Sequence, residues 1–530
     1  MRRRQLLGHA AALPLLGCGP AAPQVDGGFA GVAHERGHLL REGHDRPAPA
    51  RRYRTGVLIA GGGVAGLAAA RALRLRGVDD FALLELEDEA GGNSRGSSLE
   101  GIACPLGAHY LPVPGDAAPE VQALLEEFGL RRRVAGRWVY DERHLCHSPQ
   151  ERLYFQGAWQ EGLLPLQDVG AATLDQYRAF SQRVAQLQRQ ARHTLPLVRD
   201  RLAPALLQLD SLSLSRWLAQ EGLDDAHLRW YLDYCCRDDY GAGLDRVSAW
   251  AGLHYFASRH GFHAPGATEV PREAVLTWPQ GNGWLTQQLA APLGERLRTG
   301  RVVLRIEAGR HGVAVEVFNV TQQHVEHWQA QSCIVALPVH VAARVVQGAP
   351  AFLRQAAAGT RHAAWLVANL HLRQALLDRP GAAPSWDNVI YSDPPGSSLG
   401  YVDAMHQSLR AVPGATVLSC YHALGDTPGM RRALWETPWA HWRDRILAEL
   451  AGPHPELPQR ATRLEITRYG HAMAVPAPGT LARLQALPWH RVQGRAALQA
   501  GRLHFAHSDW SGYSVFEEAF TQGHTAGLAA

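Results

Sequence analysis

Short, mostly apolar runs bounded by turn residues recur along the chain and predict buried strands. Four of them lie at residues 57–60, 81–84, 302–306 and 333–337. Runs of this length that are apolar on both faces are typical of strands covered by helices on both sides of a parallel sheet. An alanine-rich segment at 68–73 follows the first run and is predicted to be helical. The order strand, helix, strand indicates an α/β fold.

Longer stretches between these runs carry another periodicity. Apolar positions recur every three to four residues at 174–187 and 228–256, so residues 115–275 are predicted to be mainly helical. Residues 345–465 mix strand-like runs with Pro/Gly turns and a predicted helix near 439–450. Together these two stretches are predicted to form a substrate domain inserted between pieces of the α/β domain.

Three spaced glycines follow the first apolar run. Gly61 permits a tight turn out of the strand, Gly63 lets backbone N–H groups approach a pyrophosphate, and Gly66 lets the next helix pack closely. The second run ends in Glu85, 19 residues after Gly66, where the ribose hydroxyls of a dinucleotide need an acceptor. Glycines alone are a weak signal, but this ordered set predicts a Rossmann-like domain that binds an ADP-containing cofactor.

A glycine pair, Gly91 and Gly92, follows Glu85 after an acidic stretch and offers backbone for a second close approach to phosphate. The order resembles the signature of FAD-dependent flavin amine oxidases and related desaturases. Further segments are similar to that family in the same order, at residues 278–285, 302–306, 333–338 and 501–519. The resemblance implies an α/β fold class: a Rossmann-like FAD-binding domain built from discontinuous segments, plus an inserted mixed α+β substrate domain.

No cysteine lies in a segment that matches a covalent linkage site of the family, so FAD is expected to be bound non-covalently. The resemblance also implies which residues hold it. It places the adenine against the backbone of Val303 and the flavin end near Ser511 and Gly512. The family usually has Arg directly after the glycine pair, and this chain has Asn93. The pyrophosphate charge is therefore expected to be met by Arg95 or by the helix N-terminus alone.

Three side chains are catalytic candidates by the same resemblance. His109 lies in a segment similar to one beside the flavin ring, so it is expected to donate to the flavin or to relay a proton. Tyr513 matches one wall of an aromatic substrate cage, and Tyr469 is a candidate for the opposite wall. Buried Tyr and His side chains often only satisfy a hydrogen-bonding partner, so a structural role stays open for all three.

Missing residues and missing context exclude several other chemistries. The chain contains no lysine, which excludes a Walker A loop and a pyridoxal Schiff base. Flavin amine oxidases commonly place a lysine, through a water molecule, near the reactive flavin nitrogen, and that role cannot be transferred to this chain. Residues 396–400 satisfy G-x-S-x-G, but two prolines precede them where a hydrolase has a strand, so we interpret the segment as a turn.

Composition is that of a large enzyme. The 530 residues are 46% hydrophobic and 19% charged, enough to bury more than one core. The net charge of +4 is mild and the arginine clusters are short, so no nucleic-acid surface is predicted. None of the 27 histidines has metal-site spacing, and no metal is predicted. Seven cysteines in such a chain do not form a disulfide framework.

The first 18 residues have the layout of an export signal. Arg3 and Arg4 precede a short apolar run, an order that resembles a twin-arginine signal. The sequence Leu-Leu-Gly-Cys ending at Cys18 resembles a lipoprotein cleavage site, which would make Cys18 the lipid-modified first residue of the mature chain. An ordinary signal with a chance cysteine is the alternative. Residues 19–50 lack periodicity and are predicted to be a tether.

These patterns predict an exported, periplasmic, membrane-anchored flavoprotein. We expect an amine oxidase-like, FAD-dependent oxidoreductase that passes electrons from a small organic substrate to oxygen or a membrane quinone. A desaturase or isomerase acting on an apolar substrate, and a non-catalytic flavin-binding accessory protein, are the alternatives. The predicted domains are 51–114, 276–344 and 466–530 for FAD, and 115–275 and 345–465 for the substrate.

Overall fold

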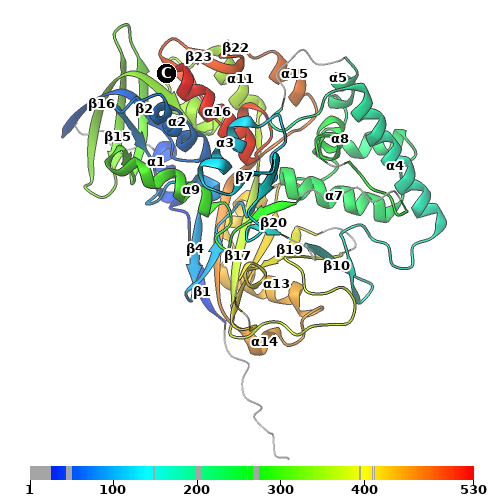
Figure 1. Cartoon of the computed structure of the whole chain (residues 1–530). Coiled ribbons are helices and arrows are strands. Elements are labelled where there is room, and N and C mark those ends of the chain that lie inside the picture. The colour runs from blue at the N-terminus through cyan, green and yellow to red at the C-terminus, as the bar shows by residue number, and fades with distance from the viewer. Residues whose placement is uncertain are drawn as a thin grey trace, which may run out of the picture.

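A computed structural model gives the arrangement of the chain, which is dominated by two large sheets (Figure 1). The described residues are 25–42, 50–146, 150–197, 204–259, 261–266, 274–392, 396–408, 410 and 412–530. The predicted export signal, with Arg3, Arg4 and Cys18, lies outside them. Within these ranges, the structure contains no helix that combines the length and the apolar character needed to cross a membrane.

The first sheet has the α/β topology that the sequence predicts. Its strands are β2 (Arg51–Ala60), β3 (Phe81–Leu84), β13 (Leu297–Arg298), β14 (Arg301–Ala308), β15 (Val313–Asn319), β16 (His324–Val335), β22 (His490–Val492), β23 (Arg495–Ala500) and β24 (Leu503–Phe505). They lie in the order β13-β3-β2-β16-β24-β23-β22, with the β14-β15 hairpin paired to β16. Strands β13, β3, β2, β16 and β24 run parallel, so both faces of the sheet must be covered.

Strand β2 shows how the two faces are filled. Val57 and Ile59 belong to the core cluster that contains helices α2 (Val64–Leu75) and α16 (Phe516–Ala529). Leu58 and Ala60 belong to the opposite cluster, with α10 (Val339–Val345) and α11 (Ala351–Gly359). This alternation follows from the two-residue period of a strand, and it explains why the run is apolar throughout.

The second sheet is mixed. Its strands are β1 (Asp26–Phe29), β10 (Glu151–Phe155), β11 (Ala158–Glu161), β17 (Arg361–Leu372), β18 (Asp387–Ile390), β19 (Ser398–Asp403), β20 (Thr416–Ala423) and β21 (Ala461–Val475). They lie in the order β1-β21-β17-β20-β19-β18-β10-β11. Leu366 and Ala368 pack toward α12 (Met430–Glu436), α13 (Trp439–Ala451) and α14 (Leu457–Arg460). Trp365 and Val367 pack on the other face, in the core shared with the helical layer.

A helical layer completes this half of the molecule. It consists of α4 (Ala171–Gln190), α5 (Pro204–Asp210), α6 (Leu214–Gln220), α7 (Ala226–Tyr240) and α8 (Ala249–Ala257), most of which gather at one side in Figure 1. The Asp225 carboxylate caps α7 by accepting from the His227 and Leu228 amides at 3.0 and 2.9 Å. Gly241, at φ +71°, ends the helix. The helical prediction for 174–187 is confirmed, and 228–256 divides into α7 and α8.

Shorter elements connect these layers. They are α1 (His34–Glu42), α3 (Pro119–Glu127), α9 (Gly283–Ala290), α15 (Thr480–Gln485), β4 (Gly96–Leu99), β5 (Ile102–Pro105), β6 (Tyr110–Pro112), β7 (Arg131–Val134), β8 (Arg137–Tyr140), β9 (Leu145–Cys146), β12 (Val275–Thr277) and the 3-10 turns η1 (Gly92–Ser94), η2 (Ala291–Arg296), η3 (Ala404–Gln407) and η4 (Ser508–Trp510).

The tether predicted for residues 19–50 differs from the structure. Strand β1 pairs in parallel with β21, and Arg36 of α1 donates to the Leu86 carbonyl at 2.9 Å. The Arg468 guanidinium lies 3.6 Å from the centroid of the Phe29 ring. Backbone pairing and single side-chain anchors hold this segment, and neither leaves an apolar period in the sequence.

Two other expectations differ locally. The predicted domain boundary at 466 falls inside β21, which lies in the second sheet over its whole length. Residues 396–400, interpreted as a turn, contain Ser398, the first residue of β19. The serine begins a strand instead of standing between a strand and an α-helix, so the segment lacks the strand-turn-helix context of a hydrolase nucleophile.

Candidate functional site

A cavity of about 470 Å³ lies between the two sheets. On one side it is lined by the residues that follow the parallel strands of the first sheet, among them Gly61, Glu85, Ala336 and His507. The other side is formed by side chains of β17, β20 and β21 in the second sheet. Open α/β sheets bind ligands at the carboxyl ends of their strands, so the topology places a ligand in this cavity.

The glycine loop after β2 forms the floor of the cavity. Gly61 has φ +104°, and a Cβ there would lie 2.3 Å from the Ala336 carbonyl oxygen. A Cβ on Gly66 would lie 1.9 Å from the Gly61 carbonyl oxygen, so only glycine permits this packing of helix on loop. Gly63 begins α2 without any side-chain cap. The free N–H groups of the first turn therefore face the cavity as an anion site.

Glu85 holds the glycine loop to the end of β3. Its carboxylate accepts from the Gly62 amide at 2.7 Å and from the Glu87 amide at 2.8 Å. Burial raises the pKa of Glu85, and these two hydrogen bonds oppose the shift. Val303 lines the same part of the cavity, where the resemblance places the adenine contact.

The second glycine pair meets the first loop. The Gly91 amide donates to the Gly62 carbonyl at 2.8 Å, and a Cβ on Gly92 would lie 3.2 Å from the Gly63 Cα. Asn93 lines the cavity and donates through its side chain to the Ala472 carbonyl at 2.7 Å. Two glycine-rich backbones thus approach each other beside the helix N-terminus.

Arg95 differs from its predicted role. Its guanidinium donates to the Gly31 carbonyl and, at 3.2 Å, to the Gly92 carbonyl, and it lies 3.6 Å from the Glu87 carboxylate. These contacts direct the Arg95 guanidinium away from the cofactor cavity and toward an outer pocket beside the N-terminal segment. The helix N-terminus, the other predicted alternative, is the group that faces the cavity.

Near the C-terminus, the residues that line the cofactor cavity are not the ones predicted from the resemblance. Ser508 and Asp509 line the cavity, whereas Ser511 and Gly512 do not. The Ser511 hydroxyl donates to the Ser508 carbonyl at 2.6 Å, and Gly512 at φ +67° packs against Thr480. Ser511 and Gly512 therefore shape the turn that presents Asp509.

Aromatic side chains from the second sheet form the opposite wall, where Trp365, Tyr421 and Tyr469 line the cavity. The Tyr469 hydroxyl donates to the Leu106 carbonyl at 2.9 Å, and the Tyr421 hydroxyl donates to a neighbouring carbonyl at 3.3 Å. His109 stacks on Tyr421 with ring centroids 4.4 Å apart. Tyr469 and Tyr421 therefore both line this wall. The sequence did not single out Tyr421, and a substrate cage that includes Tyr469 stays a prediction.

Tyr513 is not a wall of this cavity. It is 3% exposed, and its hydroxyl donates to the Asp239 carboxylate. Its ring packs on Tyr240 of α7 with centroids 5.1 Å apart. The prediction failed because the partner that orients Tyr513 lies on a helix far away in the sequence. Its role is to hold Asp239, which does line the cavity.

His109 lies where the cavity meets a second pocket. Burial lowers its pKa to about 3, although a hydrogen bond donated to the Gly107 backbone opposes the shift. The imidazole is therefore neutral near pH 7 and offers one donor and one acceptor. His109, Tyr110, Asp238 and Arg259 line both spaces, so the two are continuous through this junction.

The second pocket, of about 280 Å³, is rich in carboxylates and aromatic rings. Asp238 comes from α7, while Glu151 and Asp387 are opposite residues of β10 and β18. Burial and the neighbouring Asp239 raise the pKa of Asp238 to about 7. Burial, Asp238 and Glu151 also raise the pKa of Asp387 well above its ordinary value. Arg259 is engaged with Asp239 at 3.0 Å.

Comparison with known proteins identifies the cavity's chemistry. Residues 64–527 match the sequence profile of a family described as flavin containing amine oxidoreductase. The chain belongs to this family. AofH of Mycobacterium tuberculosis, named for a flavin-containing monoamine oxidase activity, is 27% identical over 362 residues, which are 66% of this chain and 74% of that protein.

Solved structures of three other enzymes share the fold. Putrescine oxidase bound to putrescine matches with a TM-score of 0.67 at 19% identity, covering 90% of this chain and 99% of that one. Cyclohexylamine oxidase from Brevibacterium oxydans IH-35A matches with 0.65 at 18%, covering 90% and 98%. A fatty acid isomerase from P. acnes matches with 0.57 at 15%, covering 89% and 97%.

The cofactor of a flavin amine oxidoreductase is FAD, and the cavity fits it. The uncapped N-terminus of α2 and the paired glycine loops offer backbone donors to a pyrophosphate. No cysteine of the described residues lines this cavity, in keeping with non-covalent FAD. The basic side chains at its wall are arginines and histidines, namely Arg259, Arg301, His109, His362, His471 and His507.

Proposed function

We propose that this flavin amine oxidoreductase oxidises a di- or polyamine, whose second ammonium group binds among Asp238, Asp387 and Glu151. The carboxylate-rich pocket carries the proposal. Burial and the neighbouring acids disfavour the ionised forms of Asp238 and Asp387. Arg259 in this pocket is paired with Asp239. A further cation among these carboxyl groups would favour their ionised forms. Aromatic rings in the same pocket suit the apolar carbon chain of such a substrate and attract its ammonium group.

The junction at His109 explains how one substrate reaches both spaces. A chain-like amine would place one nitrogen in the cofactor cavity and extend past His109 and Tyr110 to the carboxylates. The FAD held in this cavity would supply the two-electron oxidation of the amine to an imine, which water would hydrolyse to an aldehyde and the free amine or ammonia. Tyr421 and Tyr469 exclude water from the reacting end, which favours the neutral amine that this chemistry needs.

The carboxyl groups of this pocket also argue against a desaturase or isomerase that acts on an apolar substrate. An apolar substrate of a desaturase or isomerase would bring no positive charge to a pocket lined by Asp238, Asp387 and Glu151. A fatty acid would add a fourth carboxylate. The related isomerase fold therefore gives no support for that substrate in this chain.

The sequence supports two further parts of the proposal. The arginine pair and Cys18 support export of the folded flavoprotein and attachment to a membrane through a lipid. The missing lysine supports a quinone, rather than oxygen, as the efficient electron acceptor.

The decisive experiment compares butane-1,4-diamine with butylamine, which differ only in the second nitrogen. Anaerobic bleaching of the bound flavin should require at least tenfold less diamine than monoamine. Asp387→Asn should remove most of this preference, since losing one charged partner costs about 1.5–3 kcal/mol. Asp245→Asn, a change at an exposed carboxylate, is the matched control. Equal bleaching by both amines in the wild type would refute the second-ammonium site.

A further inference from the structure

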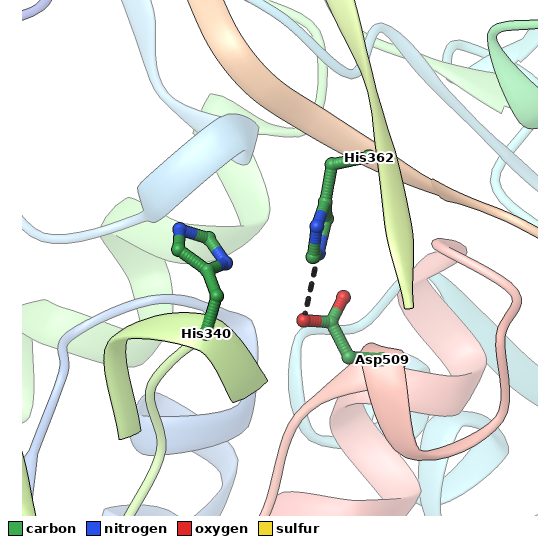
Figure 2. A group of neighbouring side chains, drawn as sticks. All are labelled: His340, His362 and Asp509. Atoms are coloured by element: carbon green, nitrogen blue, oxygen red, sulfur yellow. Dashed lines mark hydrogen bonds and ion pairs between the residues drawn. The ribbon is translucent and has the colours of Figure 1, made fainter. Parts of the chain in front are cut away.

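A cluster of His340, His362 and Asp509 lies apart from the substrate pocket, at the wall of the cofactor cavity. The three donor atoms lie within 4.8 Å of one another, and His362 Nε2 is 2.9 Å from Asp509 Oδ2. Figure 2 shows the side chains converging from three separate parts of the ribbon. They belong to α10, β17 and η4, which is why spacing in the sequence gave no metal signal.

The cluster contains a buried donor without a partner. His340 Nδ1 is inaccessible to solvent and makes no hydrogen bond within the described part of the chain, and a buried polar atom left in this state is costly. The side chains of His362 and Asp509 are only 5% and 2% exposed. A ligand bound to His340 Nδ1, His362 and Asp509 would give the unpartnered Nδ1 atom a partner.

The Asp509 carboxylate is already oriented by its surroundings. The Val339 amide donates to Oδ2 at 3.0 Å, and His507 Nδ1 lies 3.3 Å from Oδ1. Ligating carboxylates in metal sites are commonly held by such outer hydrogen bonds, which fix their direction.

We propose that His340, His362 and Asp509 bind one divalent transition-metal ion. Two imidazoles and one carboxylate are a donor set that zinc and non-haem iron use, with coordination positions left open. Tetrahedral bonds of about 2.1 Å place donor atoms about 3.4 Å apart. The His362–Asp509 spacing of 2.9 Å is close to that value. Donor atoms as far apart as 4.8 Å would have to move about 1.4 Å closer.

The position of the cluster provides an entry route for the ion and determines which parts of the fold the ion would connect. His340 and His362 also line an outer cavity of about 520 Å³, which provides entry. The ion would join β17 of the second sheet to two segments that follow strands of the first sheet. It would also place a positive charge at the wall of the FAD cavity in a chain that has no lysine.

The test uses the full-length, FAD-loaded protein without a polyhistidine tag. After treatment with a chelator and desalting, the protein is titrated with zinc sulfate, and retained zinc is counted by elemental analysis against FAD absorbance. We expect one zinc per FAD and a higher melting temperature. His340→Gln and Asp509→Asn should each weaken zinc binding by about tenfold to hundredfold or more.

Control variants keep the result interpretable. His311→Ala removes an exposed histidine in the turn between β14 and β15 and should bind zinc as the wild type does. The melting temperature without zinc reports whether each variant folds, because Asp509 lines the cofactor cavity and its substitution can change FAD content directly. His340 Nδ1 makes no hydrogen bond, within the described part of the chain, that its substitution would remove. Failure of the wild type to retain zinc would overturn the proposal. So would unchanged zinc binding by folded His340→Gln and Asp509→Asn proteins.

Discussion

Glu151 and Asp387 lie opposite each other, in register, on the parallel strands β10 and β18. Both line the pocket that continues from the FAD cavity. Burial, Asp238 and Glu151 raise the pKa of Asp387 well above its ordinary value, so ionising it beside Glu151 costs stability in the free protein. A bound cation would reverse the sign of that interaction, which links the stability of β10 and β18 to the substrate.

Asp387→Asn should therefore stabilise the substrate-free protein. Removing one of two facing carboxylates should raise the free energy of unfolding by about 0.2–1 kcal/mol at pH 8. A diamine should raise the melting temperature of the wild type and have a smaller effect on the variant. Thermal unfolding with and without butane-1,4-diamine measures both effects, and a destabilised variant with an intact diamine response would contradict the argument.

The pKa of Asp238 predicts a pH dependence. Its folded pKa of about 7 exceeds the unfolded value of about 3.9, so the folded state binds more protons between these values. The contribution of this group to stability is therefore present at low pH and is lost as pH rises from about 4 to 7. Asp238→Asn should flatten that decline. In the wild type, affinity for a diamine should rise through about pH 7, as Asp238 ionises, more than affinity for a monoamine does.

The cofactor half of the site could be predicted from the sequence because the residues that form it lie close together along the chain. Gly61, Gly63 and Glu85 lie within one strand-helix-strand unit, where chain geometry fixes their neighbours. The carboxylate pocket could not, since Glu151, Asp238 and Asp387 come from three elements and share no spacing. Their proximity depends on the order of strands in the second sheet, which periodicity does not specify.

Tertiary contacts also explain the misplaced residues. Tyr513 turns away from the cavity because Asp239 accepts its hydroxyl, and Arg95 turns away because the Gly31 carbonyl accepts from it. Gly31 itself lies in the segment predicted to be a tether. One undetected strand, β1, thus accounts for two of the differences.

Glu85→Ala should weaken FAD binding by about 1–3 kcal/mol. The change leaves the buried Gly62 amide without its acceptor, in addition to any contact with the ribose. FAD affinity measured by fluorescence titration of the apoprotein tests this expectation. Glu89→Ala, at an exposed acid nearby, should bind FAD normally, and equal affinities in the two variants would show that Glu85 does not organise the site.

Export can be tested on the N-terminal residues. Changing Arg3 and Arg4 to lysine should trap folded, FAD-loaded protein in the cytoplasm, because a twin-arginine signal requires both arginines. Cys18→Ala should permit export but release the protein from membranes, since it removes the site of lipid attachment. Cell fractionation with FAD fluorescence reports both outcomes. Membrane association of the Cys18→Ala protein at the wild-type level would exclude the lipoprotein assignment.

The missing lysine predicts slow reaction with oxygen. Among the described residues the cavity offers His109 near the substrate junction, but its pKa of about 3 leaves it neutral at pH 7. It can donate a hydrogen bond, yet it does not supply the fixed positive charge of an ammonium group. Loss of a preorganised electrostatic group commonly slows the step it assists by about 10²–10³-fold.

We therefore expect substrate-reduced flavin to reoxidise slowly in air and rapidly with a soluble quinone. Stopped-flow absorbance separates the two half-reactions in one preparation. His109→Gln should slow flavin reduction by the amine while FAD stays bound, because the substituted side chain keeps a donor but loses the stacked ring on Tyr421. Reoxidation by oxygen alone as fast as by quinone would mean that another group activates oxygen. In that case zinc-loaded and zinc-free protein should be compared, since a metal at His340, His362 and Asp509 would add a positive charge to those of Arg259 and Arg301 at the cavity wall.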